Sequence, residues 1–159
     1  MPSNAAVDAA SAAFRALVLT VYGILIVKGA EQSTLESFGA IVGNLITKFG
    51  QDSNLVKQAA AKYALIAQAW TVICNARAAA AVAAVAAASA AFRDAVQEVY
   101  GDEVAAGQEQ LTLDSRVAKV GSIIKEFGLN SDAFKEAAEK YELIVPAWTA
   151  FFNARKAAE

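Results

Sequence analysis

The stretches AWTVICNARAAA (residues 69–80) and AWTAFFNARKAA (residues 147–158) are near-identical and lie 78 positions apart. Outward from them, residues 5–81 align with residues 83–159 without a gap, and 42 of the 77 aligned residues are identical. Two copies are too few for a solenoid. We therefore predict a tandem duplication of a three-helix unit, with repeat 1 at residues 1–81 and repeat 2 at residues 82–159, forming a pseudo-twofold helical bundle.

Each copy contains three helical patterns. In repeat 1 the first pattern runs through Phe14, Val18 and Tyr22, and residues 33–36 (STLE) resemble a capping box that opens the second. The second pattern closes at Phe49-Gly50, and in repeat 2 it opens near Thr112 and closes at Phe127-Gly128. The third begins at Ser53 or Ser131, and its apolar stripe in repeat 1 comprises Val56, Ala59, Ala60, Tyr63, Ile66, Trp70 and Ile73.

Composition favours helix throughout the chain, and we predict an all-α fold. Alanine, the best intrinsic helix former, accounts for 39 of the 159 residues, and there are only two prolines. Residues 51–100 contain neither glycine nor proline, so we predict that the last helix of repeat 1 continues into the first helix of repeat 2. Such a shared central helix of about 48 residues would be roughly 70 Å long, and a bend in the alanine-rich run is the alternative. Pro146 is expected to kink the third helix of repeat 2.

The residue content excludes several classes of function. The chain has no histidine, which removes His-dependent nucleophilic catalysis and His-ligated metals, and it has no phosphate-binding glycine motif. A net charge of −2 gives no basic surface for nucleic acid, and the single Cys74 is expected to be an apolar filler. We therefore predict a protein that is not an enzyme, with no metal site and no nucleic-acid partner.

No membrane-spanning or targeting segment is expected. The longest uncharged run has 15 residues, whereas a spanning helix needs about 20 apolar ones. The N-terminal segment lacks the basic and apolar regions of a secretory signal peptide. These features predict a soluble protein and leave its compartment open.

Some polar and aromatic residues recur in both copies. An Arg–Glu ion pair is expected to cap the core of each copy, formed by Glu31 with Arg77 and by their counterparts Glu109 and Arg155. The alternative is a polar anchor for the head of an apolar ligand. Four aromatic residues also have two interpretations, since each is either a core residue or part of a ligand-binding wall: Trp70, Trp148, Tyr63 and Tyr141.

The two copies differ most in surface charge. Repeat 1 has 10 charged residues and repeat 2 has 20. On the first helix of repeat 1, Ala16, Leu19, Thr20 and Ile24 replace polar residues of repeat 2, over an arc of about 140°. An apolar outer face of this kind needs a covering partner. We predict an interface that includes Leu19, Ile24, Leu25, Phe38 and Ile41.

Two hypotheses about function follow. The first is a non-catalytic helical interaction protein, either a homodimer or a small subunit of a larger assembly, that docks through the apolar face of repeat 1. The second is a carrier that holds an apolar small molecule, such as a lipid, carotenoid or tetrapyrrole, between its helices. No particular cofactor is indicated.

Overall fold

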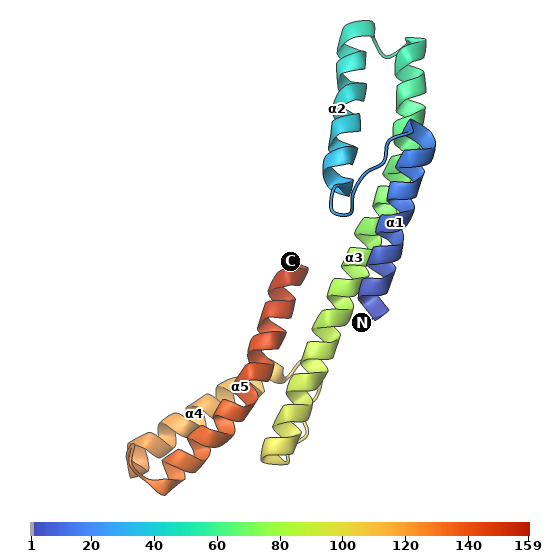
Figure 1. Ribbon diagram of the computed structural model, residues 1–159. Coiled ribbons are helices and arrows are strands. Elements are labelled where there is room, and N and C mark those ends of the chain that lie inside the picture. Colours follow the sequence, from blue (N-terminus) through green and yellow to red (C-terminus); the bar gives the residue numbers. More distant parts are fainter. Residues whose placement is uncertain (1) are drawn as a thin grey trace. The chain divides into compact units, whose positions relative to one another are not determined.

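The computed structural model describes the backbone of residues 2–159 and the side chains of residues 4–159; Met1, the first residue of the predicted repeat 1, lies outside the described residues. The described residues form five α-helices (Figure 1) and no strand. The predicted all-α class is therefore confirmed. The helices are α1 (Pro2–Tyr22), α2 (Glu31–Phe49), α3 (Asn54–Tyr100), α4 (Glu109–Phe127) and α5 (Asp132–Ala158).

Helices α1 to α4 each end at a glycine with positive φ, as at Gly23 (+71°) and Gly50 (+82°). Glycine adopts this conformation without the steric cost of a Cβ atom. Because Gly23 ends α1, Ile24 and Leu25 lie in the connection to α2. The predicted helical arc that included Ile24 is therefore wrong.

The starts of the helices are set by different side chains. Ser53 and Ser131 accept hydrogen bonds from the backbone N–H groups of Val56 and Phe134, both at 3.2 Å, so these two predicted starts are confirmed. The predicted capping box at residues 33–36 is wrong, because α2 begins at Glu31 and its N-cap residue, Ala30, makes no side-chain cap. The hydroxyls of Ser33 and Thr34 instead donate to the carbonyl of Ala30. In the same way α4 begins at Glu109, three residues before the predicted Thr112.

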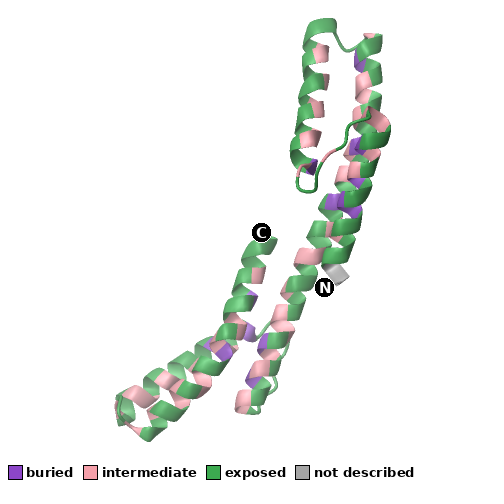
Figure 2. Cartoon of the chain, viewed as in Figure 1, coloured by how far each residue is buried: buried purple, intermediate pink, exposed green. Residues whose placement is uncertain are grey.

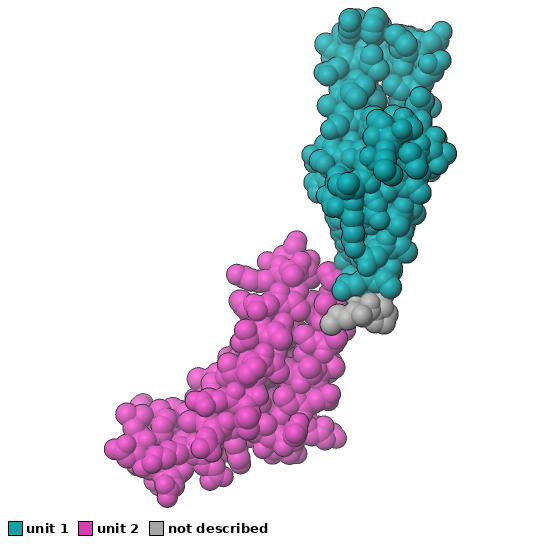
Figure 3. Space-filling model, viewed as in Figure 1, with its two compact units in different colours: residues 1–80 teal, residues 81–159 magenta. Residues whose placement is uncertain are grey.

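The chain divides into two compact units, Met1–Ala80 (unit 1) and Ala81–Glu159 (unit 2), drawn in teal and magenta in Figure 3. The division falls one residue from the predicted boundary of the repeats. Helix α3 is a single helix of 47 residues, so its first part belongs to unit 1 and its last part to unit 2. This run stays helical because it contains no turn-forming residue and because alanine, its main component, has the highest helix propensity.

The core of unit 1 joins α1 to the first part of α3. Phe14 and Val18 of α1 and Ile66 and Ile73 of α3 are fully buried (Figure 2). Full burial of a side chain of this size stabilises the fold by about 1.5–3 kcal/mol. The expectation that Cys74 fills this core is wrong: it follows the buried Ile73 and is exposed.

The core of unit 2 has the same residue types as unit 1 at three positions 78 residues later, and Phe151 stands where unit 1 has Ile73. Phe92 and Val96 of α3 and Ile144 of α5 are fully buried, and Leu113 of α4 packs against them. Proline lies inside α5, at Pro146, and the helix is unbroken there. In Figure 1 the first and last parts of α5 point in different directions.

Candidate functional site

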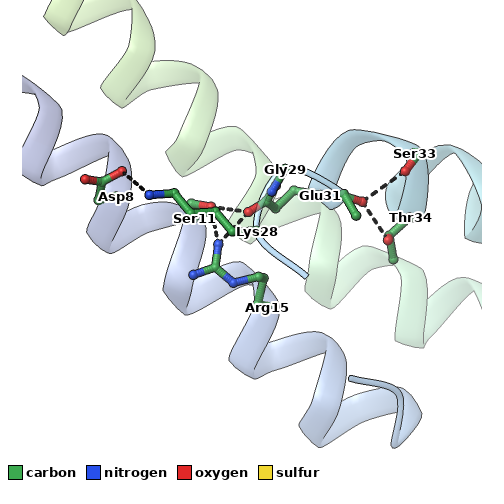
Figure 4. A network of polar contacts seen from close by, with 9 residues as sticks. Asp8, Ser11, Arg15, Lys28, Gly29, Glu31, Ser33 and Thr34 are labelled. Atoms are coloured by element: carbon green, nitrogen blue, oxygen red, sulfur yellow. Dashed lines mark hydrogen bonds and ion pairs between the residues drawn. The ribbon is translucent and has the colours of Figure 1, made fainter. Parts of the chain in front are cut away.

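A buried carboxylate fixes the start of α2 in unit 1 (Figure 4). Glu31 is only 3% exposed, and its Oε1 accepts hydrogen bonds from Ser11 and, at 2.6 Å, from Nη1 of Arg15. Its Oε2 accepts the backbone N–H of Gly29 at 2.9 Å. Arg15 also donates to Ser11 at 2.7 Å. These contacts tie α1, the connection after it and the N-terminus of α2 together.

The contacts of Glu31 strongly favour its charged form. Burial alone raises the pKa of this carboxyl, but hydrogen bonds from Ser11, from its own backbone N–H, from Arg15 and from Gly29 outweigh burial. The resulting pKa is about 2, against an ordinary value of 4.5. Glu31 therefore remains ionised at all but very acid pH.

Unit 2 contains the corresponding contacts with a looser arginine. Glu109 accepts hydrogen bonds from Ser89 and, at 2.8 Å, from the backbone N–H of Gly107. Nε of Arg93, however, lies 3.9 Å from Oε1 of Glu109, which is beyond hydrogen-bond distance. Burial alone raises the pKa of Glu109, but the hydrogen bonds and the charge of Arg93 together outweigh burial. The pKa of Glu109 is therefore below its ordinary value of 4.5.

The predicted pairing of Glu31 with Arg77 is wrong, since the partner of Glu31 is Arg15. The equivalent pairing in unit 2 is wrong too, since Glu109 forms its salt bridge with Arg93 and not with Arg155. The guanidinium of Arg77 lies over the ring of Trp70, with 5.3 Å between its central carbon and the ring centroid. Arg77 continues the helical stripe of Trp70 and therefore stays beside it on α3. The missed signal was the recurrence of Ser11 and Arg15, one helical turn apart, as Ser89 and Arg93.

The four aromatic residues proposed as a ligand wall pack against the two cores. Trp70 packs edge to face on Phe14, with 6.1 Å between the ring centroids. Trp148 packs edge to face on Phe92, with 5.5 Å between the centroids. Tyr63 lies against Gly39 of α2, where a Cβ atom would stand 3.3 Å from the tyrosine hydroxyl. Tyr141 packs on the core of unit 2. All four are partly buried, and a role for them as a ligand wall stays a prediction.

An apolar groove of about 330 Å³ lies between α2 and α3 in unit 1. Phe38 and Ile41 of α2 line it, together with Leu55 of α3. The Phe38 ring stacks on Tyr22 with 3.7 Å between centroids, and Ile41 is 48% exposed. The structure thus brings two of the predicted interface residues, Phe38 and Ile41, into one groove. The other three lie on α1 (Leu19) and on the connection after it (Ile24, Leu25).

Unit 2 has a groove of about 480 Å³ at the equivalent position, and its lining is charged. Arg116 and Lys119 stand where unit 1 has Phe38 and Ile41. Arg116 forms an ion pair with Asp102, and its guanidinium lies 3.9 Å from the centroid of the Tyr100 ring. Nζ of Lys140 lies 3.7 Å from Oε1 of Glu136 and forms a second ion pair there. The two grooves therefore share a position and differ in polarity.

Two further properties concern possible ligands and membranes. Among residues 2–159, no three Cys, Asp or Glu side chains gather in a way that could hold a metal ion. Two helical segments, Asn4–Tyr22 and Asn54–Tyr100, are long and apolar enough to cross a membrane, by length and composition only. The expectation that no segment spans a membrane stays a prediction.

No family model, no curated protein and no solved structure matches this chain.

Proposed function

We propose that this protein is a non-catalytic helical interaction protein that forms a homodimer through the apolar surface of unit 1. One observation carries the proposal. Each of the five predicted interface residues has a polar or charged counterpart 78 positions later: Gln97, Asp102, Glu103, Arg116 and Lys119. Leu19, Ile24 and Leu25 are 46%, 46% and 82% exposed, so unit 1 presents large apolar side chains to solvent.

The exposed area of the chain is large enough for one interface of standard size. The chain exposes 10063 Å² at a mass of 16.6 kDa. Two separate compact units of about 8.3 kDa each would together expose only roughly 9,100 Å². The excess of about 900 Å² is similar to the ~800 Å² that each partner buries in a standard interface. A homodimer in which each copy covers the other would remove this excess.

A non-catalytic role and an origin by tandem duplication belong to the same proposal. The absence of histidine and of phosphate-binding motifs from the sequence supports a role in binding alone. The 42 identical positions, and the matched Ser11–Glu31 and Ser89–Glu109 contacts, support the duplication. The pseudo-twofold arrangement of the two copies stays a prediction.

The test is the solution mass of a charged variant. Wild-type protein should sediment at twice the 16.6 kDa chain mass, and Leu19→Glu combined with Ile24→Asp should give a helical monomer. Both positions are nearly half exposed, so the variant should remain folded. Gln97→Glu, at the position equivalent to Leu19, is the matched control and should leave the mass unchanged. A wild-type monomer at high concentration would overturn self-association and leave only docking to a different protein.

A further inference from the structure

A second concave site lies beside Glu109, entirely within unit 2. This pocket has a volume of about 560 Å³ and is walled by α3, the last part of α5 and the start of α4. Its apolar lining includes Val82, Val85 and Phe151, and its polar lining includes Arg93, Glu109 and Arg155. A volume of this size is within the range of roughly 300–1,000 Å³ that is typical of small-molecule sites.

The pocket lies where unit 1 has an ion pair that unit 2 lacks. In unit 1, Nζ of Lys28 lies 3.5 Å from Oδ1 of Asp8 and so links the α1–α2 connection to α1. The residues 78 positions later are Ala106 and Ala86, and both of these alanines line the pocket. Replacement of both long side chains by methyl groups leaves this side of unit 2 without that link.

Arg93 at this pocket is held less closely by its carboxylate partner than Arg15 is in unit 1. In unit 1, Nη1 of Arg15 donates hydrogen bonds to Ser11 and Glu31, whereas Nε of Arg93 lies 3.9 Å from Oε1 of Glu109. Arg155 is exposed, and its guanidinium carbon lies 4.8 Å from the centroid of the Phe151 ring. Two guanidinium groups and one carboxylate thus line the same pocket beside apolar side chains. A carboxylate ligand bound there would find guanidinium groups to pair with.

From this juxtaposition we infer that the pocket binds one apolar carboxylate, a molecule with a fatty-acid-like tail and a single carboxylate head. The tail lies along Val82, Val85 and Phe151, and the carboxylate accepts hydrogen bonds from Arg93 and Arg155. The site differs from the wall of Trp70, Trp148, Tyr63 and Tyr141 that the sequence indicated. It also shares no residue with the apolar surface of unit 1.

The test is calorimetric titration of the full chain with dodecanoate, below the concentration at which this probe forms micelles. We expect one saturable site per chain, and at least tenfold weaker binding of dodecan-1-ol, which has the same tail and no charge. Ala86→Asp combined with Ala106→Lys restores the ion pair of unit 1 and should reduce dodecanoate affinity at least tenfold. Circular dichroism checks that this variant is folded.

A matched pair of arginine variants completes the test. Arg155→Met should weaken dodecanoate binding, while Arg77→Met, at the equivalent position of unit 1, should leave it unchanged. Absence of saturable binding, or wild-type affinity in the Ala86→Asp, Ala106→Lys variant, would overturn the site. Equal affinities for dodecanoate and dodecan-1-ol would overturn the role of the arginines. Because the solution mass is measured separately, failure of this site is distinct from failure of the homodimer.

Discussion

Replacement of Glu31 by glutamine should destabilise unit 1 strongly at neutral pH. The pKa of Glu31 is about 2 in the folded protein, against an ordinary 4.5. A depression of this size corresponds to at most about 3 kcal/mol of stability that depends on the charged carboxylate. Glutamine removes the charge and leaves Arg15 without its ionic partner, so the free energy of unfolding should fall by a similar amount.

The sign of the pH dependence follows from the direction of the shift. Because the folded pKa is depressed, the contribution of Glu31 is fully present above pH 4.5 and is lost as the pH falls towards 2. At pH 3 about 2 kcal/mol of it should already be gone. The difference in stability between wild type and Glu31→Gln should therefore shrink from about 3 kcal/mol at pH 7 to about 1 kcal/mol at pH 3.

The chain provides one tryptophan reporter for each unit. Trp70 packs on Phe14 in unit 1, and Trp148 packs on Phe92 in unit 2. Urea unfolding followed by Trp70 fluorescence, in a Trp148→Phe background and at fixed protein concentration, measures unit 1 alone. Glu109→Gln in the reciprocal Trp70→Phe background is the matched control. Glu109→Gln should lower the free energy of unfolding by less than Glu31→Gln does. The reason is that Arg93 is 3.9 Å from Glu109, whereas Arg15 is 2.6 Å from Glu31. A difference for Glu31→Gln that is the same at pH 7 and pH 3, or a larger cost for Glu109→Gln, would refute this reasoning.

Two further predictions concern the helices. Gly43→Ala should stabilise α2 by about 1 kcal/mol, because alanine has the higher helix propensity and a Cβ there meets nothing within 4 Å. Gly39→Ala should gain less, since its Cβ would stand 3.3 Å from the Tyr63 hydroxyl; equal gains in urea unfolding would contradict this account. Pro146→Gln should stabilise α5 by up to about 3 kcal/mol, and the matched Gln68→Pro should destabilise α3 by a similar amount. A Pro146→Gln variant that unfolds at lower urea than wild type, as reported by Trp148, would show that the proline fits its place.

The helices and cores could be predicted because they depend on local patterns. The spacing of Phe14, Val18, Ile66 and Ile73 identifies one apolar face on each of two helices, and burial then follows. The glycines after Phe49 and Phe127 identify helix ends. The long α3 also follows from sequence, because its alanine-rich run contains no residue that could end a helix.

The polar contacts could not be predicted with the same certainty, because they join residues that are distant in sequence. Ser11 and Glu31 are 20 positions apart, and only the path of residues 23–30 brings them together. Periodicity gave no reason to prefer Arg15 over Arg77 as the partner of Glu31. The capping prediction failed for a related reason. A capping box depends only on residues within four positions of one another, whereas Glu31 at the start of α2 is held by contacts with another helix.

The differences between the two units come in coupled sets. Arg116 replaces Phe38, and Asp102, which replaces Ile24, is its ion-pair partner. The Arg116 side chain is only 18% exposed, so a guanidinium there without Asp102 would be partly buried and unpaired, at a cost. Likewise Ala86 and Ala106 replace both members of the Asp8–Lys28 pair. A change in one partner alone would leave an unmatched charge, so the two residues of each set are expected to be polar together or apolar together.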